Sequence, residues 1–329
     1  MEVFSFMFPV IALFIFLFIV IVIFSNKGKK VKINDNVSEK YKDVALKLIN
    51  QNDKIEEERK KYRKKHIFIG CIIIAIAAGA FLTPILGFFT FIISFLLVIV
   101  LMIILITNKD NNSIYKEVIP SIINNYLKGL NYNHYEGISS NIYREARFEN
   151  WDRYHSDDLI SGVINNQEFI MSEVHTENRH TDKDGHTYYT TIFHGTFAKV
   201  TLKKDFKCFL NIVNNRIKLF SRDSYVTIDN EAFEKIYDVF TDDKIKAMRL
   251  LTPDVTTKMI DLYNETGIYC EIKIINNILY IRLYTGALFD FSFSNPEKEA
   301  KLIGKSVAVI DSVLKVMENF IGDIERFDV

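Results

Sequence analysis

Cysteine is scarce in this sequence, which contains 3 cysteines among 329 residues. Cys71, Cys208 and Cys270 lie far apart, and none of them belongs to a CxxC pair. Disulfide-stapled secreted domains and structural zinc sites both depend on several closely spaced cysteines. The sequence therefore predicts neither a disulfide framework nor a cysteine-based zinc site, which is usual for a protein of a reducing compartment.

Several motifs that identify enzyme classes are also absent. The sequence has no GxGxxG or GxxxxGK[ST] loop, no GxSxG turn and no HExxH helix. These motifs position phosphates, a serine nucleophile or a zinc ion, so their absence argues against the corresponding enzymes. We predict no catalytic residue and no cofactor, and we interpret the chain as a non-enzyme.

Charge is absent from two long apolar segments. Residues 3–24 form an uncharged run of 22 residues, and residues 67–106 form a second run of 40. A helix needs about 20 apolar residues to cross a bilayer. Thr83-Pro84 interrupts the second run and favours a turn, because proline removes a backbone donor and restricts the residue before it. We expect three transmembrane helices, namely a signal anchor in residues 1–24 and a helical hairpin in residues 67–106.

The orientation of these helices follows from the charges between them. Residues 25–66 hold 14 Lys/Arg and 7 Asp/Glu, a net charge of +7, and short basic segments stay cytoplasmic. The N-terminus then lies outside the cell membrane, and residues 107–329 lie in the cytoplasm. Because the chain sums to 0 and Glu2 contributes −1, residues 107–329 carry −6. We therefore expect no nucleic-acid partner, whereas the basic segment suits the anionic headgroups of a lipid bilayer.

The part beyond the apolar segments predicts an α+β domain with a mainly antiparallel sheet and C-terminal helices. Strand patterns fill about residues 157–228, and the triplets TPD and NPE mark helix starts near residues 253 and 296. The predicted layout is a signal anchor (1–24), a basic cytosolic helical segment (25–66), a transmembrane hairpin (67–106) and a cytosolic α+β domain (107–329).

A hairpin is predicted in the stretch IYCEIKIINNILYIRLY. With Asn276-Asn277 in the turn, positions that sum to 553 face each other, so Glu271 lies opposite Arg282 on a polar face. Together with Trp151, the single tryptophan, these two residues are candidates for an interaction surface. Trp151 has a second interpretation, as an edge residue that closes the core.

A second hairpin is rich in histidine. Residues 169–197 hold four of the chain's 7 histidines, and Asp184-Gly185 is a strong signal for a two-residue tip. In that register positions that sum to 369 face each other, so His175 lies opposite His194. Strand alternation then gathers four polar residues on one face, Glu173, His175, Glu177 and His194.

These four side chains have two interpretations. Imidazole and carboxylate groups are suitable ligands for zinc or another first-row metal, and a carboxylate beside an imidazole can transfer protons. Their spacing matches no recognised metal motif, however, and the same residue types are common on a solvent-facing strand or on a contact surface for a protein or ligand. The metal site therefore stays a hypothesis.

Several stretches resemble the bacterial domain-of-unknown-function family 3137. They are IEEERKKYRKK before the apolar hairpin, DDLISGVINNQEFIMSEVHTE, DKDG, TIFHGTF and FTDDKIKAMRLLTPDVTTKMIDL. The resemblance covers about residues 37–329 and implies a membrane-anchored bacterial protein with a cytosolic α+β domain. The family has no assigned activity, so no residue role is carried over. Arginine is common in the family where this sequence has His194, which argues against a metal site shared by the family.

The leading functional hypothesis is a membrane-anchored scaffold or sensor whose cytosolic domain binds a protein or a small ligand. The expected partners are the lipid bilayer and another membrane or cytosolic protein. The alternative is a metal-dependent hydrolase-like enzyme that uses the hairpin over residues 173–194. Transport is disfavoured because the predicted transmembrane helices hold few polar groups.

Overall fold

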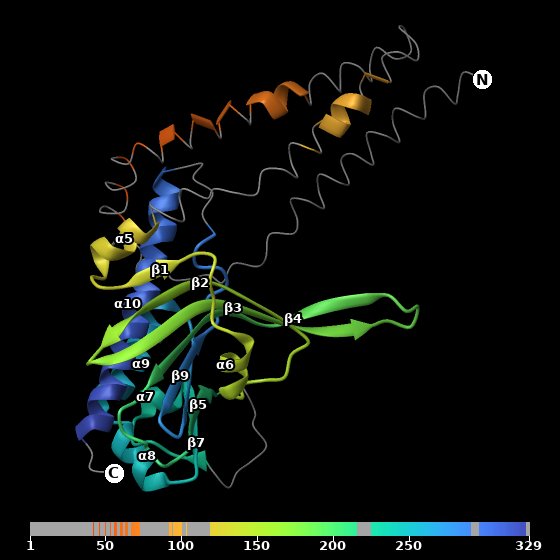
Figure 1. Ribbon diagram of the computed structural model, residues 1–329. Helices are drawn as coiled ribbons and strands as arrows, with labels where there is room; N and C mark the ends of the chain where they lie inside the picture. Colours follow the sequence, from red (N-terminus) through yellow and green to blue (C-terminus); the bar gives the residue numbers. More distant parts are fainter. Residues whose placement is uncertain are drawn as a thin grey trace. The chain divides into compact units, whose positions relative to one another are not determined.

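The computed structural model describes residues 119–215, 225–290 and 296–326, together with scattered positions between 42 and 103 (Figure 1). The chain divides into two compact units. One comprises Met1–Lys29 with Asp53–Asn112, and the other comprises Lys30–Asn52 with Ser113–Val329. The fold and the sites below belong to the second unit.

The predicted transmembrane helices lie mostly outside the described residues. Residues 1–24 are not among them, and the described positions in 67–106 are helical but few, namely 67–72, 92–93, 95–100 and 103. No helix among the described residues is both long and apolar enough to cross a membrane. The described positions of the basic segment are also helical, and Glu56 and Glu57 pair with Lys60 and Lys61 at 3.8 and 3.5 Å.

The described part of the second unit is built on a nine-stranded sheet with the order β1-β2-β3-β4-β9-β8-β5-β7-β6. Each pairing between neighbours is antiparallel, which confirms the predicted mainly antiparallel α+β fold. The strands are β1 (Asn131–Asn133), β2 (Arg153–Ile164), β3 (Gln167–Thr181), β4 (Thr187–Thr201), β5 (Leu210–Asn214), β6 (Tyr225–Val226), β7 (Tyr237–Thr241), β8 (Cys270–Ile275) and β9 (Ile278–Leu283).

The ends of α9 lie at local sequence signals. In α9, Thr252 caps the first turn by accepting from the Val255 N–H, and Gly267 ends the helix with a left-handed φ of 71°. In α10, apolar residues three or four positions apart are buried, namely Val309, Val313, Val316, Phe320 and Ile324. The helices are α5 (Ile119–Tyr126), α6 (Ser140–Glu145), α7 (Glu231–Glu234), α8 (Lys244–Leu250), α9 (Pro253–Thr266) and α10 (Pro296–Arg326).

Different helices cover the two faces of the sheet. Tyr143 of α6 packs with Phe193 and Phe197 of β4 in one core cluster. On the other face, Ile310 of α10 lies with Met171 of β3 around a small cavity. The sheet is therefore buried on both sides near its centre.

Candidate functional site

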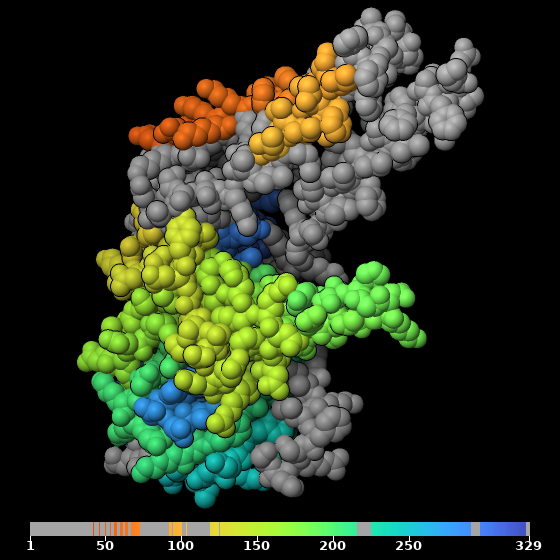
Figure 2. Space-filling view, turned by 45° about the vertical axis from the view of Figure 1, so that its right-hand side comes forward, coloured from red at the N-terminus to blue at the C-terminus, as the bar shows by residue number. Residues whose placement is uncertain are grey.

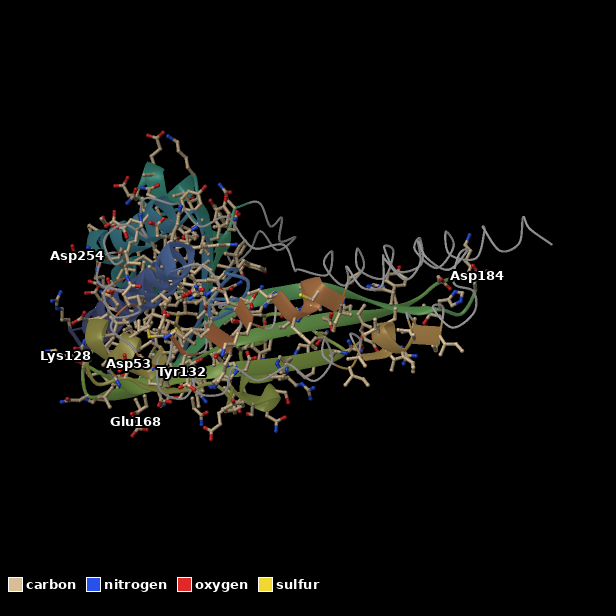
Figure 3. All side chains as sticks on the ribbon, turned by 90° about the horizontal axis from the view of Figure 1, so that it is seen from above. Asp53, Lys128, Tyr132, Glu168, Asp184 and Asp254 are labelled. Atoms are coloured by element: carbon tan, nitrogen blue, oxygen red, sulfur yellow. The ribbon has the colours of Figure 1, made fainter. Side chains whose placement is uncertain are left out.

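The β3–β4 hairpin extends beyond the rest of the sheet. Figures 1 and 2 show it in green, projecting from the folded body, and Figure 3 places Asp184 at its tip, far from Tyr132. Strand β2 pairs with β3 only as far as Glu177, and β9 pairs with β4 only from Thr196. Beyond these two residues the hairpin has no described strand on either side.

The predicted register of this hairpin is correct at its base and wrong at its tip. His175 faces His194 as predicted. The tip is not the predicted two-residue turn, because the last pair is Thr181 with Thr187 and the five residues between them form the loop. A bulge after Thr176 compensates for this shift by leaving Ile192 without an opposite residue. Glu177 consequently faces Thr191 rather than Ile192.

The four predicted metal ligands already contact one another or other protein groups. His194 Nε2 lies 2.9 Å from Glu173 Oε1, and the Leu288 N–H donates to Glu173 Oε2 at 3.1 Å. The His175 ring stacks on the His194 ring at 4.6 Å, and burial together with His194 lowers the pKa of His175. Glu177 pairs with an arginine of β2 at 3.2 Å. The group is a ladder of pairs across three strands, with no common centre for an ion.

A different carboxylate group forms where β2 is irregular. The register shifts between Asp157 and Ile160, and Asp158 adopts a left-handed φ of 55°. As a result, ligand oxygens of Asp157, Asp158 and Glu173 lie within 4.8 Å of one another. Alternation in a regular strand would have put the two neighbouring aspartates on opposite faces. The sequence signal was the Asp-Asp pair inside a strand pattern, since aspartate tolerates this backbone.

Asp158 ties the edge strand β1 to β2. The residue is 4% exposed, its carboxylate accepts from the Tyr132 hydroxyl, and its Oδ1 lies 2.6 Å from His134 Nδ1. Burial raises the pKa of Asp158 to about 6, although the hydrogen bonds from Tyr132 and His134 act in the opposite direction. The carboxyl group therefore changes charge close to neutral pH.

A cavity of about 10 Å³ adjoins this carboxylate group and is lined by Asp158, Ile160, Met171, Ser172, Glu173, Thr196, Leu288, Phe289 and Ile310. That volume accommodates about one water molecule. Carboxylates of this kind suit a hard divalent cation, and imidazole is a further ligand type. However, Asp158 and Glu173 already accept hydrogen bonds from protein donors. The site is too small for an organic substrate.

The raised pKa of Asp158 makes the stability of the domain depend on pH. The unfolded chain releases this proton near pH 4 and the folded chain near pH 6, so the stabilising contribution is full below about pH 4. It is lost as the pH rises through 6. We expect Asp158→Asn to match the parent chain near pH 4 and to be more stable by about 2 kcal/mol at pH 7.5.

Urea denaturation of both chains at the two pH values measures this difference. Asparagine also tolerates a left-handed backbone, so the substitution keeps the bulge. Asp261→Asn is a matched control on the surface of α9, because this carboxyl is half exposed with a single lysine at 3.8 Å. Equal pH dependence in the parent chain and in Asp158→Asn would refute the assignment.

Two of the three residues predicted for an interaction surface are buried. Glu271 faces Arg282 as the register predicts, but these side chains are 1% and 7% exposed. The prediction of an exposed polar face is wrong here because α6 and the segment after it cover this part of the sheet. Arg282 binds both Glu271 and Glu149, and Glu149 also accepts from the Tyr143 hydroxyl at 2.5 Å.

Aromatic rings and a lysine complete this buried ion-pair network. The Arg282 guanidinium lies 4.2 Å from the Phe148 ring centre, and Lys273 donates to the Arg147 carbonyl. Burial lowers the pKa of Lys273 to about 8, with a further contribution from Arg282. For Arg282 itself, burial lowers the pKa, but Glu271 and the other anionic partners outweigh that effect and raise it. The network fastens α6 to the sheet.

Trp151 closes the edge of the same core. It is half-buried against the cluster around Tyr143, its ring centre lies 5.2 Å from that of Tyr154, and the Arg144 guanidinium lies 4.9 Å above it. These contacts agree with the second interpretation of this residue, a core edge. Exposed aromatic residues lie instead on the projecting hairpin, at Tyr188 and Tyr189, and the sequence pattern did not predict them as surface anchors.

Comparison with known proteins gives a family match over part of the chain and no activity. The family model described as "Protein of unknown function (DUF3137)" matches residues 191–322, from the outer part of β4 into α10. The crystal structure of the mycobacterial trehalose monomycolate transport factor A, TtfA, aligns at 9% identity and a TM-score of 0.30, over 60% of this chain and 96% of that chain. A similarity this low supports no conclusion. No curated protein matches the chain.

Proposed function

Because the DUF3137 model that matches residues 191–322 is of unknown function, we propose the role of this chain from its own geometry. The protein is a membrane-tethered binding module whose α+β domain contacts a protein partner through the β3–β4 hairpin. The observation that carries this proposal is the projection of the hairpin beyond its neighbouring strands, with exposed tyrosines and an edge that no strand of the described residues pairs with. Exposed strand edges are sites at which another chain can pair.

A protein partner is favoured over a small ligand. The cavity beside Glu173 has a volume of about 10 Å³, whereas pockets for small molecules measure several hundred Å³. The hydrolase alternative is not favoured either, because Glu173 and His194 bond to each other and His175 is turned toward Thr191.

We retain the bilayer anchor, with residues 107–329 in the cytoplasm, on the strength of the uncharged runs and the basic segment between them.

Photo-crosslinking in intact cells tests this role. A photoreactive amino acid in place of Tyr188, which is 52% exposed, is expected to give an adduct with a protein in salt-washed membranes. The same probe in place of Met248, which is 54% exposed on α8, is the matched control and is expected to give none. Recovery of the chain in the soluble fraction would refute the anchor.

A shortened hairpin provides the second arm of this test. Asn178 faces Thr190, so residues 179–189 can be replaced by Asn-Gly, which makes a two-residue turn without changing the register. We expect this variant to fold and to lose the partner. Adducts of equal yield from positions 188 and 248, or normal partner binding by the shortened chain, would contradict the proposed role.

A further inference from the structure

The two edges of the projecting hairpin differ. On the β3 side, the Asp152 N–H donates to the Glu177 carbonyl at 3.0 Å, and the Asp152 carboxylate accepts from the Arg179 N–H at 2.7 Å. This edge is capped almost to the tip. On the β4 side, the nearest described contact to the backbone is Gly286 N–H with the His194 carbonyl. From Thr187 to Phe193, no strand of the described part pairs with β4 on that side.

The register shows which backbone groups of β4 face the open side. In an antiparallel pair, two residues directly opposite each other point their N–H and C=O groups either both inward or both outward. Arg179 points its N–H away from β4, and it lies opposite Tyr189. Tyr189 therefore points outward from β3, as do Thr187 and Thr191, two residues away on either side. These three residues offer donors and acceptors to an incoming strand.

The open edge carries no charge. Its sequence from Thr187 to Phe193 is TYYTTIF, without the lysine, proline or inward-facing charge that proteins use to block edge pairing. A two-fold axis sets a strand antiparallel to its own copy, so a charged residue on the axis would directly face its own like charge. An uncharged edge avoids this repulsion, and it offers an oppositely charged foreign strand nothing to recognise.

We propose that two copies of this chain pair edge to edge through β4, antiparallel, with Tyr189 on the two-fold axis. This inference rests on the proposed function and names a second copy as the partner. In this register Thr187 of one copy lies opposite Thr191 of the other, and all three outward-facing residues exchange hydrogen bonds. Tyr188 then faces Thr190 of the second copy, an aromatic and β-branched pair of the kind that stabilises sheets.

A disulfide on the axis tests this arrangement. In a hydrogen-bonded antiparallel pair the two Cα atoms are about 5.5 Å apart, within the range of a disulfide. Tyr189→Cys in a full-length Cys71→Ser chain is expected to form a disulfide-linked dimer under mild oxidation. Cys208 and Cys270 are buried and do not compete. The matched control is Arg179→Cys, directly opposite Tyr189 on the capped edge of the same hairpin, which is expected to stay monomeric.

Charged substitutions of Tyr189 provide a test that does not depend on oxidation. Tyr189→Lys alone or Tyr189→Glu alone puts like charges on the axis and is expected to weaken dimerisation roughly 2- to 5-fold, because a directly opposed like-charge pair is destabilising. A mixture of the two variants is expected to restore it. Each substitution removes the contact of Tyr189 with the Arg153 guanidinium, 3.5 Å from its ring centre, so that loss is common to all three samples.

The outcomes separate this inference from the proposed function. No dimer from Tyr189→Cys and no rescue in the mixture, together with an adduct to a different protein at position 188, would reject the second copy and keep the binding role. No adduct at position 188 and no dimer would reject both. A dimer of equal yield from Arg179→Cys would show random collision and would overturn the proposed register.

Discussion

Arg282→Ala is expected to lower the free energy of unfolding by about 3–5 kcal/mol, because it leaves buried carboxylates without their cation. Glu271 is 1% exposed and Glu149 lies on the same guanidinium, so neither carboxylate can recover full hydration in the folded state. The substitution also removes the guanidinium from the face of Phe148. Urea denaturation of the full chain, followed by the tyrosine and tryptophan signals, measures the change.

Two further variants show whether charge is the cause. Arg326→Ala removes an arginine that is 76% exposed and 3.4 Å from Asp323, so we expect a change below about 1 kcal/mol. Arg282→Met combined with Glu271→Leu removes the more deeply buried of the two carboxylates together with their cation, and leaves only Glu149 unpaired, so it is expected to be less destabilised than Arg282→Ala. Equal losses for Arg282→Ala and Arg326→Ala would refute a stabilising role of the network.

Gly195→Ala is expected to destabilise the fold by about 3 kcal/mol or more, through overpacking against backbone. A Cβ atom at this position would lie 1.9 Å from the Leu283 carbonyl oxygen and 2.7 Å from the Thr285 nitrogen. Both atoms belong to the chain at the end of β9, so relief requires that two strands move apart. A glycine inside a strand commonly marks such a close approach.

Gly322→Ala is the matched control for this substitution. Gly322 lies within α10, and a Cβ atom there would meet nothing within 4 Å. Because alanine is the better helix former, we expect this variant to be more stable by up to about 1 kcal/mol. Thermal or urea denaturation gives both values. The same sign of change at the two glycines would contradict the assignment of the Gly195 effect to a backbone clash.

Local signals in the sequence were sufficient for much of the fold. The triplet TPD predicted the start of α9, where Thr252 caps the first turn, and Asn276-Asn277 predicted the full register of β8 with β9. These features depend on residues close together in the chain. The register at the base of the β3–β4 hairpin was predicted correctly, although the predicted two-residue turn is wrong. The longer loop shifts the register by one residue, and the bulge at Ile192 shifts it back.

What the sequence could not provide was set by contacts between distant segments. Alternation placed Glu271 and Arg282 on one face, but only the chain around Glu149 decides whether that face meets water. In the same way, the short strand β1 brings Tyr132 and His134 to Asp158, and the local sequence of neither segment predicts this contact. The carboxylate group is a product of tertiary structure and of one irregular strand.

The length of β4 has a mechanical consequence. This strand runs without interruption from the outer end of the hairpin to its ladder with β9, where six residues from Thr196 to Thr201 are paired. Ladder hydrogen bonds lie across the strand direction. Tension applied at the outer end and directed along β4 would therefore load these hydrogen bonds together in shear. The projecting hairpin would then transmit force into the centre of the domain, and the bonds would not break one after another.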